Sequence, residues 1–241
     1  GAPLDAGVHN ADMLIYLLGG VDSVFAEIAI NESQRRLRPM NEVAPVLAEM
    51  YNHRREDGYD TGDIVEQTAV DTAFAVIRFK SGAIGQLIMT DTSHGQSLGV
   101  STVSGSSGTM YRPRSRSGES PRIVRGDGTE IMGDALLDLV PGFELDDTLS
   151  TLWNGARHIS SYDMDFRDID SKILAYEYLD MVQAAESGRQ PEVGPQEGMD
   201  ALALAYALME SGVSKTPVTV EDVAEGRVSE FQDEVDDEMG I

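Results

Sequence analysis

Hydrophobic and polar positions divide the chain into a helical start, a β-rich middle and a helical end. Apolar residues recur at helical spacing over residues 5–18, 168–187 and 198–212, and glycine follows two of these stretches at Gly19 and Gly188. Alternating stretches predict strands at residues 21–30, 71–79, 83–89, 98–103, 109–111, 122–124, 129–131 and 218–220. Glycine-containing turns between successive strands predict hairpins. The sequence therefore predicts an α+β fold, an open and mostly antiparallel β-sheet with helices packed on one face.

The domain organisation follows from the same pattern. The 241 residues are 41% apolar, which suffices for a sizeable core, so we expect one domain over residues 1–241. A polar excursion covers residues 31–66, with a short helix at 43–51, and an acidic terminal helix lies within residues 228–241. The helix at 198–212 carries an apolar stripe, which we expect to face the core: Met199, Leu202, Tyr206, Met209 and Val213.

The net charge of the chain limits the kinds of partner that it can bind. The formal net charge is −24, and lysine occurs only at Lys80, Lys172 and Lys215, so the other 15 of the 18 basic residues are arginine. Abundant carboxylates with few lysines are typical of a protein that stays hydrated in concentrated salt. We therefore expect a halophilic protein; an ordinary acidic protein is the alternative. A nucleic-acid phosphate backbone is excluded as a natural partner.

Several function classes lack their signatures in this sequence. There is no cysteine, which removes thiolate catalysis and disulfides and is typical of a cytoplasmic protein. No apolar run reaches the ~20 residues that span a bilayer, and no signal-peptide pattern opens the chain, so no membrane partner is expected. No glycine-rich dinucleotide or P-loop motif follows a strand and opens a helix. The glycine cluster at residues 104–108 lies between two predicted strands, where a turn is expected, so we expect no cofactor-binding residues in this chain.

The residues with the clearest chemistry stand at the start of the chain. Asp5, His9 and Asp12 are spaced so that a helix carries all three on one face, and Tyr16 continues the stripe. A carboxylate beside an imidazole fixes its tautomer and raises its basicity, as in a general base that acts on a hydroxyl. Three other interpretations stay open: Asp5 as a helix N-cap, His9 as a core histidine, and the trio as metal ligands.

Five stretches in this order resemble the C-terminal domain of the glucose–fructose oxidoreductase, inositol dehydrogenase and MocA family. The first is Asp5-x-x-x-His9-x-x-Asp12 before an apolar helix and a Gly-Gly turn. The others are Val70-Asp71-Thr72-Ala73 leading to Phe79-x-Ser81-Gly82-Ala83-Ile84-Gly85, then Ser93-His94-Gly95, then the turn at residues 104–109, and finally the paired closing helices with Pro217-Val218. The resemblance covers most of the chain except residues 31–66 and part of 134–161.

The resemblance implies a concrete activity. Family members join a Rossmann domain that binds NAD or NADP to this second domain, and they oxidise a sugar or cyclitol hydroxyl. His9 would take the hydroxyl proton with support from Asp5. The family's Glu-Lys-Pro motif belongs to the Rossmann half and is missing here, so we expect that domain upstream or in a separate chain. The sheet often forms the oligomer interface in this family, which implies a homo-oligomer.

Substrate hydroxyls need fixed polar partners, and the candidates for this role are Asp12, His94, Arg157, His158 and Tyr162. The stretch at residues 153–158 combines an aromatic ring with hydrogen-bond donors, a combination that suits sugar faces and hydroxyls. A solvated loop is the alternative interpretation for residues 157–162. The alternative to a dehydrogenase is a non-catalytic binding or oligomerisation module that keeps the fold, and a metal-dependent isomerase or lyase is a more distant third.

Overall fold

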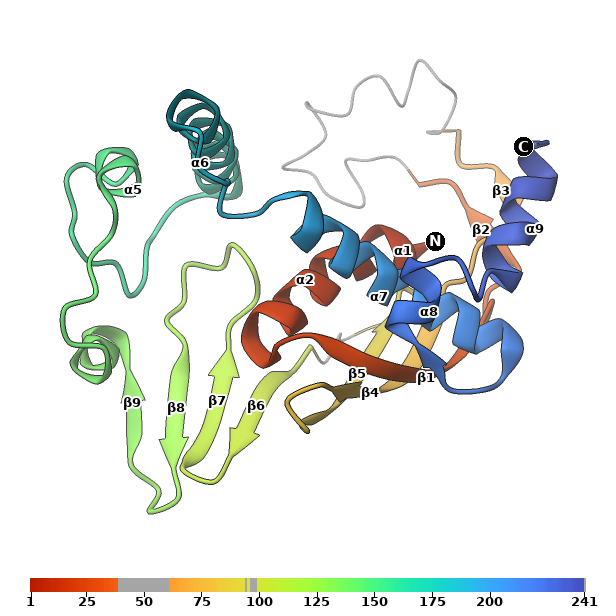
Figure 1. The fold of residues 1–241 in the computed structure, drawn as a ribbon, viewed down its shortest axis with the longest axis horizontal. Helices are drawn as coiled ribbons and strands as arrows, with labels where there is room; N and C mark the ends of the chain where they lie inside the picture. The colour runs from red at the N-terminus through yellow and green to blue at the C-terminus, as the bar shows by residue number, and fades with distance from the viewer. Residues whose placement is uncertain (39–60, 94, 96–98, 241) are drawn as a thin grey trace. The chain divides into compact units, whose positions relative to one another are not determined.

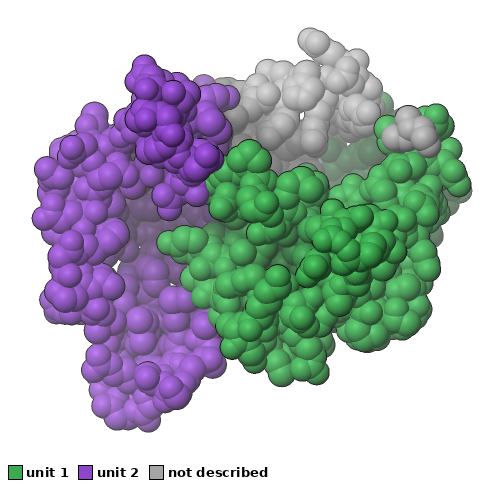
Figure 2. All heavy atoms as spheres, viewed as in Figure 1, with its two compact units in different colours: residues 1–95, 193–241 green, residues 96–192 purple. Residues whose placement is uncertain are grey.

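The structure is a computed structural model that describes residues 1–38, 61–93, 95 and 99–240. It divides into two compact units, shown in different colours in Figure 2. Unit 1 comprises Gly1–Gly95 and Val193–Ile241, and unit 2 comprises Gln96–Glu192. The single domain expected over residues 1–241 stays a prediction.

Unit 1 is built on a four-stranded sheet in the order β10 (Val218–Thr219), β1 (Val21–Ala29), β4 (Thr72–Phe79) and β5 (Ile84–Thr90). All of its strand pairs are antiparallel. On β4 the buried residues alternate with exposed ones, as expected for a strand with one covered face. The predicted first strand and the predicted central hairpin are confirmed.

Helices cover one face of this sheet (Figure 1). Helix α2 (Gly7–Leu18) packs on α7 (Pro195–Ser214), which in turn lies against β1. The core between them contains Val24, Ile77 and Phe79 from the strands together with Leu204 and Leu208 from α7. The stripe predicted for α7 is wrong in three positions, since Met199, Leu202 and Val213 are exposed. The helix instead buries a face rich in small residues, including Ala201, Ala207, Ser211 and Gly212, which allows close approach to the sheet.

Short elements complete unit 1. Helix α1 (Ala2–Asp5) precedes α2, and a two-stranded sheet pairs β2 (Gln34–Arg36) with β3 (Ile64–Glu66). Helices α8 (Val220–Ala224) and α9 (Glu230–Met239) end the chain. The acidic terminal helix is therefore confirmed, whereas α8 was not predicted. The short helix expected at 43–51 lies outside the described residues.

Unit 2 contains an antiparallel meander of β6 (Ser101–Gly105), β7 (Gly108–Arg112), β8 (Arg122–Arg125) and β9 (Glu130–Met132). The glycine cluster forms the turn between β6 and β7, with Gly105 paired to Gly108, as predicted. A 3₁₀-helix (Gly133–Leu139) and helices α5 (Asp147–Leu152) and α6 (Phe166–Ser187) follow. Asp165 caps the start of α6 by accepting from the Asp168 N–H, and Gly188 ends the helix in a left-handed conformation.

The fold class is confirmed as α+β with antiparallel open sheets. The strands of the described residues belong to three sheets, however, where the sequence predicted one. Alternation along a strand reports which face is buried but not which other strand it pairs with, so the sheet boundaries were not visible in the pattern.

Candidate functional site

Asp5, His9 and Asp12 lie on the first two helices of unit 1. Asp5 is the last residue of α1, and His9 and Asp12 follow within α2. Asp5 and His9 are exposed and Asp12 is partly buried, whereas Gly7 and Ala11 of the same helix are buried. The predicted stripe is therefore a solvent-accessible face, which a base acting on a small substrate requires.

The helix predicted over residues 5–18 is interrupted at Ala6, between α1 and α2. Asn10 closes the junction, since its Nδ2 donates to the Ala6 carbonyl at 2.9 Å. The N-caps of the two helices are Gly1 and Ala6, so Asp5 caps neither of them and the N-cap interpretation is wrong. The exposure of His9 likewise rules out the core-histidine interpretation.

The Asp5 and His9 side chains have no hydrogen bond or ion pair to one another in the part of the chain that the structure describes. Their role as a catalytic pair therefore stays a prediction, which rests on their spacing and shared exposure. Among the same described residues, no group of three His, Cys, Asp or Glu side chains could hold a metal ion. The interpretation of Asp5, His9 and Asp12 as metal ligands is thus unsupported.

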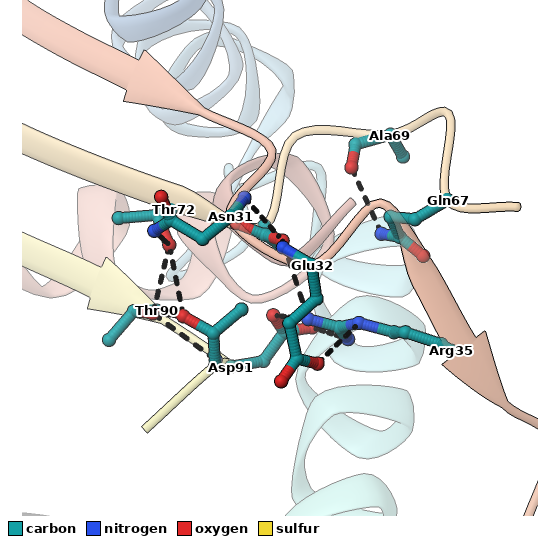
Figure 3. A network of polar contacts seen from close by, with 10 residues as sticks. Asn31, Glu32, Arg35, Gln67, Ala69, Thr72, Thr90 and Asp91 are labelled. Carbon is teal, nitrogen blue, oxygen red and sulfur yellow. Dashed lines mark hydrogen bonds and ion pairs between the residues drawn. The ribbon is translucent and has the colours of Figure 1, made fainter. Parts of the chain in front are cut away.

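A polar network occupies the end of the sheet against which α1 lies (Figure 3). At its centre is the Asp71 carboxylate, which is fully buried. It accepts from the backbone N–H groups of Asn31 and Glu32, each at 3.0 Å, and faces Arg35 Nη2 at 3.6 Å. Arg35 in turn holds both oxygens of Asp91, at 2.7 and 2.6 Å. In the sequence, Asp71 stands out only as part of a family motif, and this network was not predicted.

Hydroxyl groups extend the network along β4 and β5. The Thr72 hydroxyl lies 2.9 Å from that of Thr90 and accepts from Asn31 Nδ2 at 2.8 Å. Burial by itself would raise the pKa of the Asp71 carboxyl, but the N–H donors of Asn31 and Glu32, the Thr72 hydroxyl and Arg35 together outweigh burial, so its pKa lies below the usual range. Asp71 is thus a buried carboxylate held in its charged form.

The remaining substrate-binding candidates are distributed over the chain. Arg157, His158 and Tyr162 lie in unit 2, while Asp12 lies in unit 1. Arg157 pairs with Asp147 at 3.3 Å, and the Tyr162 ring lies 5.3 Å from that of Trp153. The backbone N–H of Tyr162 donates to the Gly118 carbonyl, which fixes the end of this loop. His94 lies outside the described residues.

A cleft of about 500 Å³ lies between α5 and α6 of unit 2. Its lining is almost entirely polar: Asp146, Asp147, Thr148, Tyr176, Asp180, Gln183, Arg189 and Glu192. Burial and the neighbouring carboxylates, Asp146 first, raise the pKa of Tyr176. The Glu192 N–H and the Arg189 guanidinium lower the pKa of Asp180. These groups bind one another, so the polar side chains that line the cleft already have partners within the protein. The cleft was not predicted from the sequence.

Comparison with known protein families decides the class of the chain. The family model described as "Oxidoreductase family, C-terminal alpha/beta domain" matches residues 1–220. The chain belongs to the Gfo/Idh/MocA oxidoreductase family. Within this Gfo/Idh/MocA domain the match includes the Asp5–His9 stretch, unit 2 and both long helices, and it ends before α9. No curated protein matches the sequence.

Solved structures share the fold at low sequence identity. A levoglucosan dehydrogenase in complex with NADH and L-sorbose is 19% identical with a TM-score of 0.61, covering 93% of this chain and 52% of its own. An NAD binding oxidoreductase from Klebsiella pneumoniae is 21% identical with a TM-score of 0.60, covering 91% and 50%. An oxidoreductase from Agrobacterium radiobacter in complex with NAD⁺, L-tartaric acid and magnesium is 13% identical with a TM-score of 0.55, covering 90% and 48%.

The chain therefore spans about half the length of the solved structures that it matches. In the described part of the chain, no helix combines the length and the apolar character needed to cross a bilayer.

Proposed function

We propose that this chain is the substrate-binding and catalytic half of an NAD(P)-dependent oxidoreductase that oxidises a sugar or cyclitol hydroxyl. The observation that carries the proposal is the exposed Asp5–His9 pair in a domain of the Gfo/Idh/MocA family. The structurally similar levoglucosan dehydrogenase, solved in complex with NADH and L-sorbose, supports a carbohydrate substrate.

In this proposal His9 is the general base. A ring nitrogen of His9 takes the proton of the substrate hydroxyl while the carbinol carbon is oxidised, because a carbonyl that forms with the proton still attached would carry positive charge. Asp5 precedes His9 by four residues, and its carboxylate would orient the imidazole and stabilise the imidazolium once the substrate is bound. A base of this kind contributes about 10²–10⁴-fold to the rate.

The described residues of this chain do not form the usual binding site for the hydride acceptor, NAD or NADP. A dinucleotide site needs a glycine-rich turn from a parallel strand into a helix, and the sheets of the described residues are antiparallel. We therefore place the cofactor in a Rossmann domain, in the same or a separate chain. The half-length coverage of the solved relatives supports this division.

Substrate hydroxyls are assigned to Asp12, His94, Arg157, His158 and Tyr162. In unit 2 this assignment is supported by the proximity of Tyr162 to Trp153, whose ring centroids are 5.3 Å apart, because it places an aromatic ring beside one of the candidate hydroxyl partners.

We also propose that the protein forms a homo-oligomer through the uncovered face of the sheet in unit 1. Five large apolar side chains of β1, β4 and β5 are exposed there: Phe25, Phe74, Val76, Ile84 and Ile88. The strand register makes them neighbours, with Phe25 opposite Val76 and Phe74 opposite Ile88. A contiguous apolar surface of this kind is typical of an interface.

Replacement of Asp5 and of His9 tests whether these residues catalyse the proposed oxidation. The full-length protein that carries this chain should produce NADH or NADPH from polyols or aldoses, and His9→Ala should lower kcat by about 10²–10⁴-fold without changing the melting temperature. Asp5→Asn should lower kcat by a smaller factor. The matched control is Asp22→Asn, an exposed aspartate beyond α2, which should leave kcat unchanged. Unchanged turnover in His9→Ala would remove His9 from the mechanism.

The alternative, a non-catalytic module, makes a different prediction for the same assay. No polyol or aldose would then produce a reduced cofactor with either NAD or NADP, and the protein would bind sugars or associate without turnover.

A further inference from the structure

We propose that Asp71 is a positioning residue for the Asp5–His9 pair, because its buried carboxylate fixes the end of the sheet on which α1 and the start of α2 are seated. The contacts between the two helices and this end of the sheet are present in the structure. The catalytic part of this inference rests on the proposed function.

Helix α1 is seated directly beside Asp71. A Cβ on Gly1, the N-cap of α1, would lie 2.0 Å from the carbonyl oxygen of Val70, so the two backbones are in close contact. Pro3 of α1 is buried, and the helix contacts both β4 and β5. Gly7, at the start of α2, lies against Met89, since a Cβ there would be 3.6 Å from the sulfur. The two helices around this junction therefore rest on Val70, which adjoins Asp71, and on Met89 of the neighbouring strand β5.

The main chain of Asp71 joins three strands at this point. Its N–H donates to the Ala29 carbonyl at 3.1 Å, and its carbonyl accepts from the Asp91 N–H at 3.2 Å. Its side chain meanwhile holds the chain that leaves β1, through the N–H groups of Asn31 and Glu32. Because Val70 is the preceding residue, a shift of Asp71 moves the carbonyl on which Gly1 rests.

A carboxylate is needed here because the Asn31 and Glu32 N–H groups and the Arg35 guanidinium, which face it, are all donors. Both oxygens lie 3.0 Å from the Asn31 N–H, one also accepts from Glu32, and Arg35 stands 3.6 Å away. An amide in the same place would direct two N–H donors at other donors, and a buried group without a partner is costly. Asp71→Asn is therefore a nearly isosteric change that loosens this end of the sheet.

A purely structural role must be distinguished from positioning, and the chain offers a matched control. Glu210 of α7 is also a buried carboxylate that accepts from two backbone N–H groups, those of Phe231 and Gln232 at 3.0 and 3.2 Å. These donors belong to α9, beyond the family match. Glu210→Gln thus removes the same chemistry at a different place.

The test compares Asp71→Asn with Glu210→Gln in the full-length protein. The first readout needs no substrate: amide hydrogen exchange over residues 2–12 should accelerate at least 10-fold in Asp71→Asn, and the His9 ring signals should shift. In Glu210→Gln the faster exchange should be confined to α9. The second readout is kinetic. Asp71→Asn should lower kcat at least 10-fold with KM changed less than 2-fold, because small misplacements of a catalytic group slow chemistry strongly. Glu210→Gln should keep the wild-type kcat below its melting temperature.

Three outcomes separate this inference from the proposed function. Unchanged exchange over residues 2–12 in Asp71→Asn overturns the inference. Wild-type kcat in Asp71→Asn, when His9→Ala has lost turnover, also overturns it and leaves the proposed function standing. Wild-type kcat in both Asp71→Asn and His9→Ala overturns the proposed function, while faster exchange over residues 2–12 in Asp71→Asn would still support the contact between the helices and this end of the sheet. If Asp71→Asn does not fold, Arg35→Gln removes the outer partner of the carboxylate, and the same readouts apply to it.

Discussion

Gly212 of α7 lies directly against Ile28 of β1. A Cβ on Gly212 would be 2.5 Å from Ile28 Cγ1, 2.6 Å from Cγ2 and 2.7 Å from Cδ1, closer than packed carbon atoms approach. The neighbouring Ser211 hydroxyl accepts from the Ala26 N–H at 2.9 Å, so helix and strand are also joined by a hydrogen bond. The helix can therefore pack this closely on β1 only because residue 212 has no side chain.

Gly212→Ala should destabilise the protein, although alanine is the better helix former. Overpacking of a close contact costs about 1–3 kcal/mol, which outweighs the helix-propensity gain of about 1 kcal/mol. The matched control is Gly198→Ala in the same helix, where a Cβ would meet nothing within 4 Å. That variant should gain up to about 1 kcal/mol. Urea unfolding of both variants measures the difference, and equal stability of Gly212→Ala and wild type would contradict the close packing.

The Asp71 network should make stability depend on pH in acid. The folded-state pKa of Asp71 lies below its unfolded value of about 3.9, so the unfolded state takes up the proton first as the pH falls. The stabilisation is therefore complete above pH of about 4 and is lost as the pH falls through the folded pKa. The free energy of unfolding of wild type minus that of Asp71→Asn should be about 1–3 kcal/mol at neutral pH. The same difference should shrink below pH of about 4. A difference that stays constant with pH would contradict a charged Asp71.

Alternation along the strands made much of unit 1 predictable. On β4 the side chains of Ala73, Ala75 and Ile77 enter the core while Phe74 and Val76 face outward, so the pattern gave both the strand and its buried face. The helix patterns were similarly informative, because each has caps or glycines at its ends.

Tertiary contacts were not predictable in the same way. The local break at Ala6 was also not predicted, because the side-chain hydrogen bond from Asn10 to the Ala6 carbonyl has no signature in the sequence. Glu210 caps the start of α9 from 21 residues away. A buried carboxylate in a helix gives no sign in the sequence of which distant N–H groups it will meet. The partners of Asp71 were not predictable for the same reason, because they too lie far away in the sequence. The Asp5–His9 pair could be proposed because its members are four residues apart.

Oligomerisation through the uncovered face of the sheet in unit 1 can be tested by placing a charged side chain on that face. Val76→Asp places a carboxylate opposite Phe25, among exposed apolar side chains, so it should dissociate the proposed oligomer while destabilising the subunit by only about 1 kcal/mol through strand propensity. Met181→Asp on α6, also at an exposed apolar position, is the control and should leave the assembly intact. Sedimentation velocity gives the mass of each variant, and an unchanged mass for Val76→Asp would place the interface elsewhere.

Salt should stabilise the protein, because its net charge is −24 and its carboxylates repel one another at low ionic strength. We expect the melting temperature to rise steadily with KCl concentration. The effect should be strong at α9, where exposed carboxylates follow one another at helical spacing: Glu230, Asp233, Glu234, Asp237 and Glu238.

Glu234→Lys should weaken the salt dependence of α9, since it converts the i,i+4 pairs with Glu230 and Glu238 from repulsive to attractive, each worth about 0.2–0.5 kcal/mol. Glu234→Gln is the control that removes the repulsion without adding attraction, so it should fall between wild type and Glu234→Lys. Hydrogen exchange of α9 amides at low and high KCl measures the effect locally, and melting curves measure it globally. A melting temperature insensitive to KCl would contradict the halophilic interpretation. If melting responds to salt but α9 exchange does not, the repulsion that salt screens lies outside the terminal helix.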